Sequence, residues 1–318
     1  MRITIRKHTI LVCILQFTND YRKIPTILKN LTLYGFYRKL MILIIKTNIM
    51  SIGVSLHIGL NEVDSNHYDG WNGKLGACEN DARDMERIAS SQGFKTKLLL
   101  RSKATRENVI TTIRDAAKIL SKNDIFYLSY SGHGGQLPDL NGDEPDGQDE
   151  TWCLYDGQYT DDELNELWFL FSAGVRIFVT SDSCHSGTII KEAGYLPQIF
   201  SPFTPRCMDS PHALSTYSKN IDFYKPILSS LKHLKADDLK SEIILISGCQ
   251  DNQYSYDGTF NGAFTAALKR IWNGGKFNKN YRSFHKQIQN LMPDYQSPNF
   301  LTFGKKNQKF ENQKPFTI

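Results

Sequence analysis

From residue 51 onward, short apolar runs alternate with longer segments in which apolar residues recur every three or four positions. The apolar runs predict buried strands, and the first of them is "VSLHIGL" at residues 54–60. The longer segments predict amphipathic helices, because a period of about 3.6 residues places apolar side chains on one helix face. Strands that alternate with helices are typical of a mostly parallel sheet covered by helices. The pattern therefore predicts an α/β fold.

The remaining predicted elements continue this alternation. The further strands cover residues 95–100, 124–135, 175–187, 241–248 and 299–304. The helices cover residues 78–94, 105–121, 160–171, 261–272 and 281–292. Thr105 is the predicted N-cap of the second helix, because its hydroxyl can accept a hydrogen bond from an amide of the first turn. We expect residues 191–240 to form a long exposed linker, because Pro, Ser and Lys are frequent there and apolar residues show no period.

The charge of the chain is unevenly distributed. The formal net charge is +5, but residues 1–49 hold nine basic residues and one acidic residue, Asp20. This leaves 29 of the 38 basic residues and 32 of the 33 acidic residues for residues 50–318. The predicted fold is therefore mildly acidic, and we expect it to bind no nucleic acid.

Residues 1–49 form a basic leader that we expect to lie outside the fold. Its first apolar run, "TILVCIL", follows basic residues as in a signal peptide, but no small-x-small cleavage site comes after it. The second run, "LMILII", is too short to cross a bilayer. A predicted strand follows Met50 directly, which favours translation from that residue. We expect residues 50–318 to be cytoplasmic and to make no membrane contact. Secretion or membrane anchoring is expected only if residues 1–49 are translated as part of the protein.

The cysteines indicate neither a disulfide framework nor a zinc site. There are six of them, without CxxC pairs or zinc-ligand spacing. A reducing, intracellular setting is the expectation. The positions are Cys13, Cys78, Cys153, Cys184, Cys207 and Cys249.

Two of the predicted strands end in residues that can do chemistry. "YSGHGG" carries His133 and "SDSCHSG" carries Cys184, and ligands of parallel α/β sheets gather at the carboxyl ends of the strands. A thiol near neutral pH is mostly protonated, so a nucleophilic cysteine needs a base nearby. We expect His133 to be this base, because His185 follows Cys184 directly and neighbours in an extended segment point to opposite faces. Either residue alone would be interpreted as structural; together they predict a catalytic pair.

The residues around the pair narrow the chemistry. Glycines such as Gly134 let backbone amides approach a substrate closely, as an oxyanion site requires. A tyrosine-phosphatase site is excluded, because Ile190 stands where the phosphate-binding loop of such an enzyme needs an arginine.

At these motifs the sequence resembles the metacaspases, the caspase-like cysteine peptidases of plants, fungi, protists and bacteria. "YSGHGGQ" and "DSCHSG" have the order and spacing of that family, and "GACENDARDM", "GDEPDGQDE", "TDDEL" and "ISGCQDNQYSYDGTFNGAFT" also match. The resemblance implies a caspase-hemoglobinase fold, a three-layer sandwich with a mostly parallel central sheet and helices on both faces. It further implies a large-subunit-like part (50–190), a linker or processing loop (191–240) and a small-subunit-like part (241–318).

The resemblance also implies roles for individual residues. Cys184 would attack a peptide carbonyl, His133 would transfer the protons, and the amides of Gly134 and Cys184 would receive the oxyanion. Metacaspases cleave after arginine or lysine, and the residues that line their specificity pocket match Cys78, Asp81, Ser131 and Asp182 here. The sequence itself supports this role for Asp182. Asp182 and Cys184 stand at positions i and i+2 of an extended run and therefore share one face.

Calcium is a possible activator, because many metacaspases need it. The metal site of the family would map to Asp149, Asp161 and Asp162. Lys191 stands where a further acid is common, and an ammonium group beside a divalent ion is unfavourable, so the sequence leaves calcium dependence open. An EF-hand is excluded, because Glu144 replaces the glycine that its loop requires.

The resemblance implies polypeptide substrates with Arg or Lys at the cleavage site, and we expect a monomer. Self-processing in the linker is a further hypothesis, because Arg206 and several lysines lie in what we predict to be exposed chain. Two alternatives remain, a catalytically silent caspase-like module used for binding or assembly, and a related cysteine peptidase directed at Asp or Asn. The presence of both catalytic residues argues against the first, and the acids Asp81 and Asp182 argue against the second.

Overall fold

A computed structural model describes residues 51–142, 144, 146–184, 204–232, 234–235, 238–249 and 255–318. The chain divides into residues 1–50 and residues 51–318, and only the second unit is described. No helix of these described ranges is long and apolar enough to cross a membrane.

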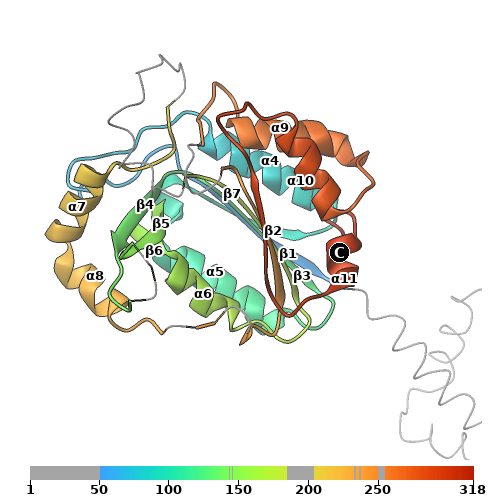
Figure 1. Ribbon diagram of the computed structural model, residues 1–318, viewed down its shortest axis with the longest axis horizontal. Coiled ribbons are helices and arrows are strands. Elements are labelled where there is room, and N and C mark those ends of the chain that lie inside the picture. The colour runs from blue at the N-terminus through green and yellow to red at the C-terminus, as the bar shows by residue number, and fades with distance from the viewer. Residues whose placement is uncertain are drawn as a thin grey trace, which may run out of the picture. The chain divides into compact units, whose positions relative to one another are not determined.

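A six-stranded sheet forms the centre of the fold (Figure 1), in the order β2-β1-β3-β7-β8-β9. The first five strands in this order are parallel, and β9 runs antiparallel to β8. The strands are β1 (Gly53–Gly59), β2 (Lys95–Leu100), β3 (Ile125–Ser131), β7 (Arg176–Asp182), β8 (Glu242–Ser247) and β9 (Asn299–Gly304). The sheet confirms the prediction of an α/β fold with a mostly parallel sheet.

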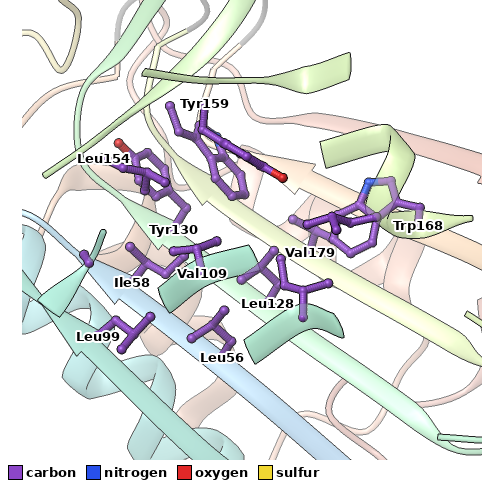
Figure 2. Packing of buried hydrophobic residues seen from close by; sticks show 14 of the residues in the cluster. Leu56, Ile58, Leu99, Val109, Leu128, Tyr130, Leu154, Tyr159, Trp168 and Val179 are labelled. Carbon is purple, nitrogen blue, oxygen red and sulfur yellow. The ribbon is translucent and has the colours of Figure 1, made fainter. Parts of the chain in front are cut away.

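Helices cover both faces of this sheet, because each strand sends successive apolar side chains to opposite sides. On one face, α4 (Cys78–Ser91), α9 (Ala263–Trp272), α10 (Tyr281–Gln289) and α11 (Gln308–Asn312) contribute to a core around Tyr127 and Phe178. On the other face, α5 (Arg106–Ile119) and α6 (Asp161–Trp168) pack on Leu128 and Val179. Figure 2 shows this second core, in which Val109 and Trp168 meet apolar side chains of the sheet. The result is the expected three-layer arrangement.

The helix starts agree with the capping residues of the sequence. Thr105 accepts a hydrogen bond from the amide of Asn108, as predicted for the start of α5. Thr160 and Glu163 form a reciprocal capping box at the start of α6, which satisfies two amides that have no partner within the helix.

A second, smaller sheet follows β3 and was not predicted. It consists of β4 (Gly134–Pro138), β5 (Gln148–Leu154) and β6 (Gly157–Thr160), all antiparallel. The acidic loop of the sequence connects β4 to β5. This sheet therefore begins one residue after His133, and its position is tied to that of the histidine.

The described part of residues 191–240 is not the irregular loop that the sequence predicted, although many of its side chains are exposed as expected. Two helices lie there, α7 (Ser210–Lys219) and α8 (Ile221–Leu228). Tyr224 of α8 is buried, packs on Leu137 of β4, and accepts a hydrogen bond from the amide of Gln158. Asp209 caps α7 by accepting from the amide of His212. The helices were missed because both are short, and a few buried side chains give no clear period. Residues 191–203 lie outside the described ranges.

Candidate active site

The carboxyl ends of β3 and β7 bring His133 and Cys184 to one edge of the sheet. The two strands are parallel neighbours, and their register pairs Ser131 with Asp182. His133 and Cys184 each follow two residues after this pair. The site is therefore positioned by the parallel register, in the place where α/β sheets hold ligands.

His133 is buried and oriented by a backbone carbonyl. Its Nε2 lies 3.0 Å from the carbonyl oxygen of Gly73, so Nε2 carries the proton, because a carbonyl can only accept. The ring packs against Trp71 with 4.8 Å between the ring centroids. Burial lowers the pKa of His133 to about 4, which keeps the imidazole neutral at pH 7. Nδ1, which is also buried, has no hydrogen-bond partner within the described part of the chain.

Cys184 is a buried thiol in this structure. Burial raises its pKa well above the ordinary value, so the protonated form dominates. The amide of Ser255 donates a hydrogen bond to Sγ at 2.8 Å. The nucleophile therefore has to lose its proton during the reaction, which requires a base such as the free nitrogen of a neutral histidine.

The candidate specificity pocket contains an arginine of the same chain. The guanidinium of Arg206, which is 0% exposed, lies 2.7 Å from Asp81, 3.0 Å from Asp182 and 2.9 Å from Asp257. It also donates to the hydroxyl of Ser131 at 2.9 Å. Burial alone would lower the pKa of Arg206, but the surrounding carboxylates raise it well above its ordinary value. The prediction that Arg206 is exposed is therefore wrong, because three carboxylates compensate the cost of removing it from water.

The pocket carboxylates are held by neighbouring polar groups. The structure brings together the four predicted pocket residues; the buried thiol of Cys78 interacts with Ser131, Asp81 and Arg206. Burial raises the pKa of Asp81, and the guanidinium of Arg206 opposes this shift. Further donors fix the carboxylates: the amide of Gly262 for Asp81, Ser255 and Thr265 for Asp182, and the amides of Gly76 and Ala77 for Asp257. The carboxylates therefore surround the planar guanidinium of Arg206 with fixed acceptors.

The main chain of Arg206 is bound as closely as its side chain. Its carbonyl oxygen accepts hydrogen bonds from the amides of Gly134 at 3.0 Å and Cys184 at 3.2 Å. Its own amide donates to the carbonyl oxygen of Ser255 at 2.9 Å. Two amides that converge on one carbonyl oxygen can stabilise the negative charge that develops there when a nucleophile attacks the carbonyl carbon.

The predicted metal residues do not converge on one point. Asp149 is buried and faces the side of β5 opposite to Glu150, and Asp162 accepts a hydrogen bond from the side-chain amide of Asn141. Asp161 instead joins Glu144 and Glu150, with carboxylate oxygens within 4.8 Å of one another. Removal from water is the main cause that raises the pKa of Glu150 to about 8 and of Asp161 to about 7, although Asp161 is exposed at the surface.

Sequence reasoning missed several residues of this site. Asp257 was not assigned, although it lies in a quoted family motif, because a single acid among tyrosines and glycines has no pattern. Gly73 and Trp71 come from a loop without periodic residues. No sequence pattern indicates that this loop contacts His133. His185, Ile190 and Lys191 lie outside the described residues.

Comparisons with known proteins agree with this geometry. A family model described as the caspase domain matches residues 63–314. Metacaspase-1 of Schizosaccharomyces pombe is 31% identical over 67% of this chain and 57% of that protein. Metacaspase-1 of Ajellomyces capsulatus is 31% identical over 67% of this chain and 68% of that protein. The crystal structure of protein GSU0716 from Geobacter sulfurreducens is 52% identical, with a TM-score of 0.79, over 84% of this chain and 99% of that chain.

The chain therefore belongs to the caspase-domain family of cysteine peptidases and, within it, to the metacaspases. The family match confirms the caspase-hemoglobinase fold expected from the sequence. The chain spans about three fifths of the length of the first curated relatives that it matches.

Proposed function

We propose that the protein is a cysteine endopeptidase that hydrolyses peptide bonds after arginine, and more slowly after lysine. One observation carries the proposal: an arginine side chain lies among Asp81, Asp182 and Asp257 while its carbonyl oxygen is held by the amides of Gly134 and Cys184. A polypeptide substrate would present its own arginine and carbonyl group in the same way.

In the proposed reaction, Cys184 is the nucleophile and His133 transfers the protons. Sγ attacks the carbonyl carbon of the substrate as its proton moves to the free Nδ1 of the neutral His133. The amides of Gly134 and Cys184 stabilise the oxyanion, and each such donor contributes about 3 to 4 kcal/mol in the transition state. Nδ1 then returns the proton to the leaving amine, and a water molecule deprotonated by His133 hydrolyses the thioester. The carbonyl of Gly73 keeps the ring oriented throughout.

The shape of the pocket favours arginine over lysine. Two guanidinium nitrogens of Arg206 reach three carboxylates and the hydroxyl of Ser131 at once. An ammonium group is a single point and cannot match this spread of acceptors. A basic side chain would gain about 2 to 5 kcal/mol over a neutral one from the buried charge pairs, and an aspartate would be repelled. The Asp- or Asn-directed alternative is therefore disfavoured.

A calcium ion as activator is part of the proposal. The carboxylates of Glu144, Glu150 and Asp161 offer the oxygen ligands that calcium prefers. Burial is the main cause that raises the pKa of Glu150 and Asp161, neighbouring carboxylates add to the shift, and a divalent cation bound there would favour the ionised forms. Calcium here would act on the loop between β4 and β5 and not on the reacting atoms, because a cysteine nucleophile needs no metal.

The test is peptide hydrolysis by the full chain and by a Cys184→Ala variant. Fluorogenic peptides that end in Arg, Lys, Asp or Asn would be assayed in calcium and in chelator. We expect hydrolysis after Arg, slower hydrolysis after Lys, none after Asp or Asn, and none by the variant. If the full chain cleaves no Arg or Lys peptide either in calcium or in chelator, the catalytically silent binding module becomes the better explanation.

A further inference from the structure

The two faces of the central sheet are covered unequally at β8 and β9. On one face, Ile244 and Ile246 of β8 lie in the core that α9 and α10 help to form. On the other face, the register places Leu301 opposite Leu245, and Leu301 and Phe303 are 38% and 36% exposed. These apolar side chains form the floor of a cavity of about 680 Å³. This volume is typical of sites that bind small organic ligands.

The rest of the cavity lining combines acids with aromatic rings. Five of the described residues that line the cavity are acidic and none is basic; the acids are Glu144, Asp146, Glu150, Asp161 and Asp162. Carboxylate oxygens of Glu150 and Asp161 lie within 4.8 Å of one another. The aromatic residues are Trp152, Tyr159 and Trp168. We propose that the cavity binds an organic cation with an apolar body, its ammonium group at Glu150 and Asp161 and its apolar part on the side chains of β8 and β9.

The acids and the apolar floor together select this class of ligand. A metal ion at the carboxylates would leave Leu301 and Phe303 in contact with water, and a neutral apolar ligand would add no positive charge beside Glu150 and Asp161. An amine with a hydrocarbon or aromatic group satisfies both, because burial of apolar area favours binding and an ammonium group forms charge-assisted hydrogen bonds with carboxylates. The surrounding aromatic faces attract a cation further. An anionic ligand with the same body would be repelled.

The protonation of the carboxylates is compatible with such a ligand. Burial is the main cause that raises the pKa of Glu150 and Asp161, and the neighbouring acids add to the shift. An ammonium group bound beside them would favour the ionised forms, because an opposite charge lowers the pKa of a carboxyl group. Charge and apolar contact therefore act together at this site.

The cavity is separate from the candidate specificity pocket. Ser181 of β7 lines the cavity, whereas its neighbour Asp182 contacts the guanidinium of Arg206. Neighbours on a strand point to opposite faces of the sheet, so β7 itself lies between the two sites. A cation bound in the cavity should therefore not compete with an arginine side chain, and its binding does not depend on peptidase activity.

The test is a fluorescence titration of the full-length Cys184→Ala chain with dansylcadaverine, a naphthalene sulfonamide whose short alkyl chain ends in a primary amine. Chelator is present, because the calcium ion of the proposed function would occupy the same carboxylates. We expect saturable binding, and about tenfold weaker binding of the N-acetylated probe, which keeps the body and lacks the charge. Excess acetyl-arginine amide should displace none of the bound probe. Displacement would place the probe in the specificity pocket and overturn the inference.

Two variants test the two halves of the site. Glu150→Gln should weaken binding of the probe about tenfold, and Leu301→Ser should weaken it several-fold because apolar contact is lost. The matched controls are Glu107→Gln, an exposed acid of α5, and Leu214→Ser, an exposed leucine of α7; both should bind like the parent chain. Thermal unfolding would verify that all four variants fold.

Three results would overturn the inference and leave the proposed function standing. The first is no saturable binding, or equal affinity for the charged and the acetylated probe. The second is full affinity in both Glu150→Gln and Leu301→Ser, which would place the probe elsewhere. The third is a dimer, seen by sedimentation, that Leu301→Ser dissociates, because a second copy would then cover the floor of the cavity. Failure of the active chain to hydrolyse arginine peptides would overturn the function and leave this site unaffected.

Discussion

The backbone nitrogen of Gly134 lies 3.0 Å from the carbonyl oxygen of Arg206. Gly134 can approach this closely because it has no side chain: a Cβ atom there would lie 1.7 Å from the carbonyl oxygen of Cys184. The glycine after His133 therefore sets both the start of β4 and the position of one of the two amides that we propose as oxyanion donors.

Gly134→Ala should abolish most of the activity. The added methyl group has to push β4 away from Cys184, which withdraws the amide from the oxyanion. Loss of one such donor lowers kcat about 100- to 1,000-fold. The measurement is peptide hydrolysis together with thermal unfolding. Gly142→Ala adds a methyl group in open space at a positive φ of 82° and controls for glycine replacement as such. Equal activity of the two variants would contradict the role of Gly134.

Asp257→Asn should weaken the recognition of arginine substrates. The substitution removes one of three carboxylates around the guanidinium, at a cost of about 2 kcal/mol or more, which is roughly 30-fold in kcat/KM. The ratio of kcat/KM for Arg and Lys peptides should fall as well. Asp222→Asn, an exposed acid at the start of α8, is the matched control. An unchanged ratio would mean that Asp81 and Asp182 alone define the pocket.

The stability of the intact protein should depend on the protonation of His133. Its folded pKa of about 4 lies below the ordinary value of 6.5, so the unfolded chain binds more protons between these limits. The contribution is therefore complete above pH 6.5 and is lost as the pH falls toward 4, by about 2 kcal/mol between pH 7 and pH 5. Denaturant unfolding of Cys184→Ala with and without His133→Gln measures it. Identical pH dependence of the two proteins would show that His133 titrates normally in the fold.

Calcium should stabilise the protein more at pH 8 than at pH 6. The pKa values of Glu150 and Asp161 are raised from the ordinary 4.5 and 3.8 to about 8 and about 7, so the folded state loses stability as the pH rises from the ordinary values to the raised ones. A bound cation removes this penalty. The measurement is the calcium-induced shift of Tm at both pH values for wild type, Glu150→Gln and the control Asp294→Asn. A shift that Glu150→Gln retains in full would place calcium elsewhere.

The sequence predicted the parts of the site that lie at the ends of strands with a clear hydrophobic pattern. The apolar runs of β3 and β7 predicted buried parallel strands, so the meeting of His133 and Cys184 at one edge could be expected. The alternation of an extended chain also placed Asp182 on the face of Cys184. The antiparallel sheet β4 to β6 could not be predicted, because its strands are short and contain glycines and a proline.

The position of Arg206 lay beyond any local pattern. Its neighbours include prolines and serines, a composition typical of exposed chain. What buries it are contacts with Asp81, Asp182 and Asp257, which are distant in sequence, and a bridge between Pro205 and Tyr256. Only the three-dimensional arrangement shows that a supposed linker contains the side chain that fills the pocket.

The burial of Arg206 among acids from α4, β7 and the segment after β8 also has an evolutionary consequence. A pocket that holds its own buried arginine resists change at one position alone, because a single replacement would upset the balance of buried charges. Positions 81, 182, 206 and 257 should therefore covary among homologues, and a lineage that exchanges the residue at 206 should show compensating replacements among the three acids.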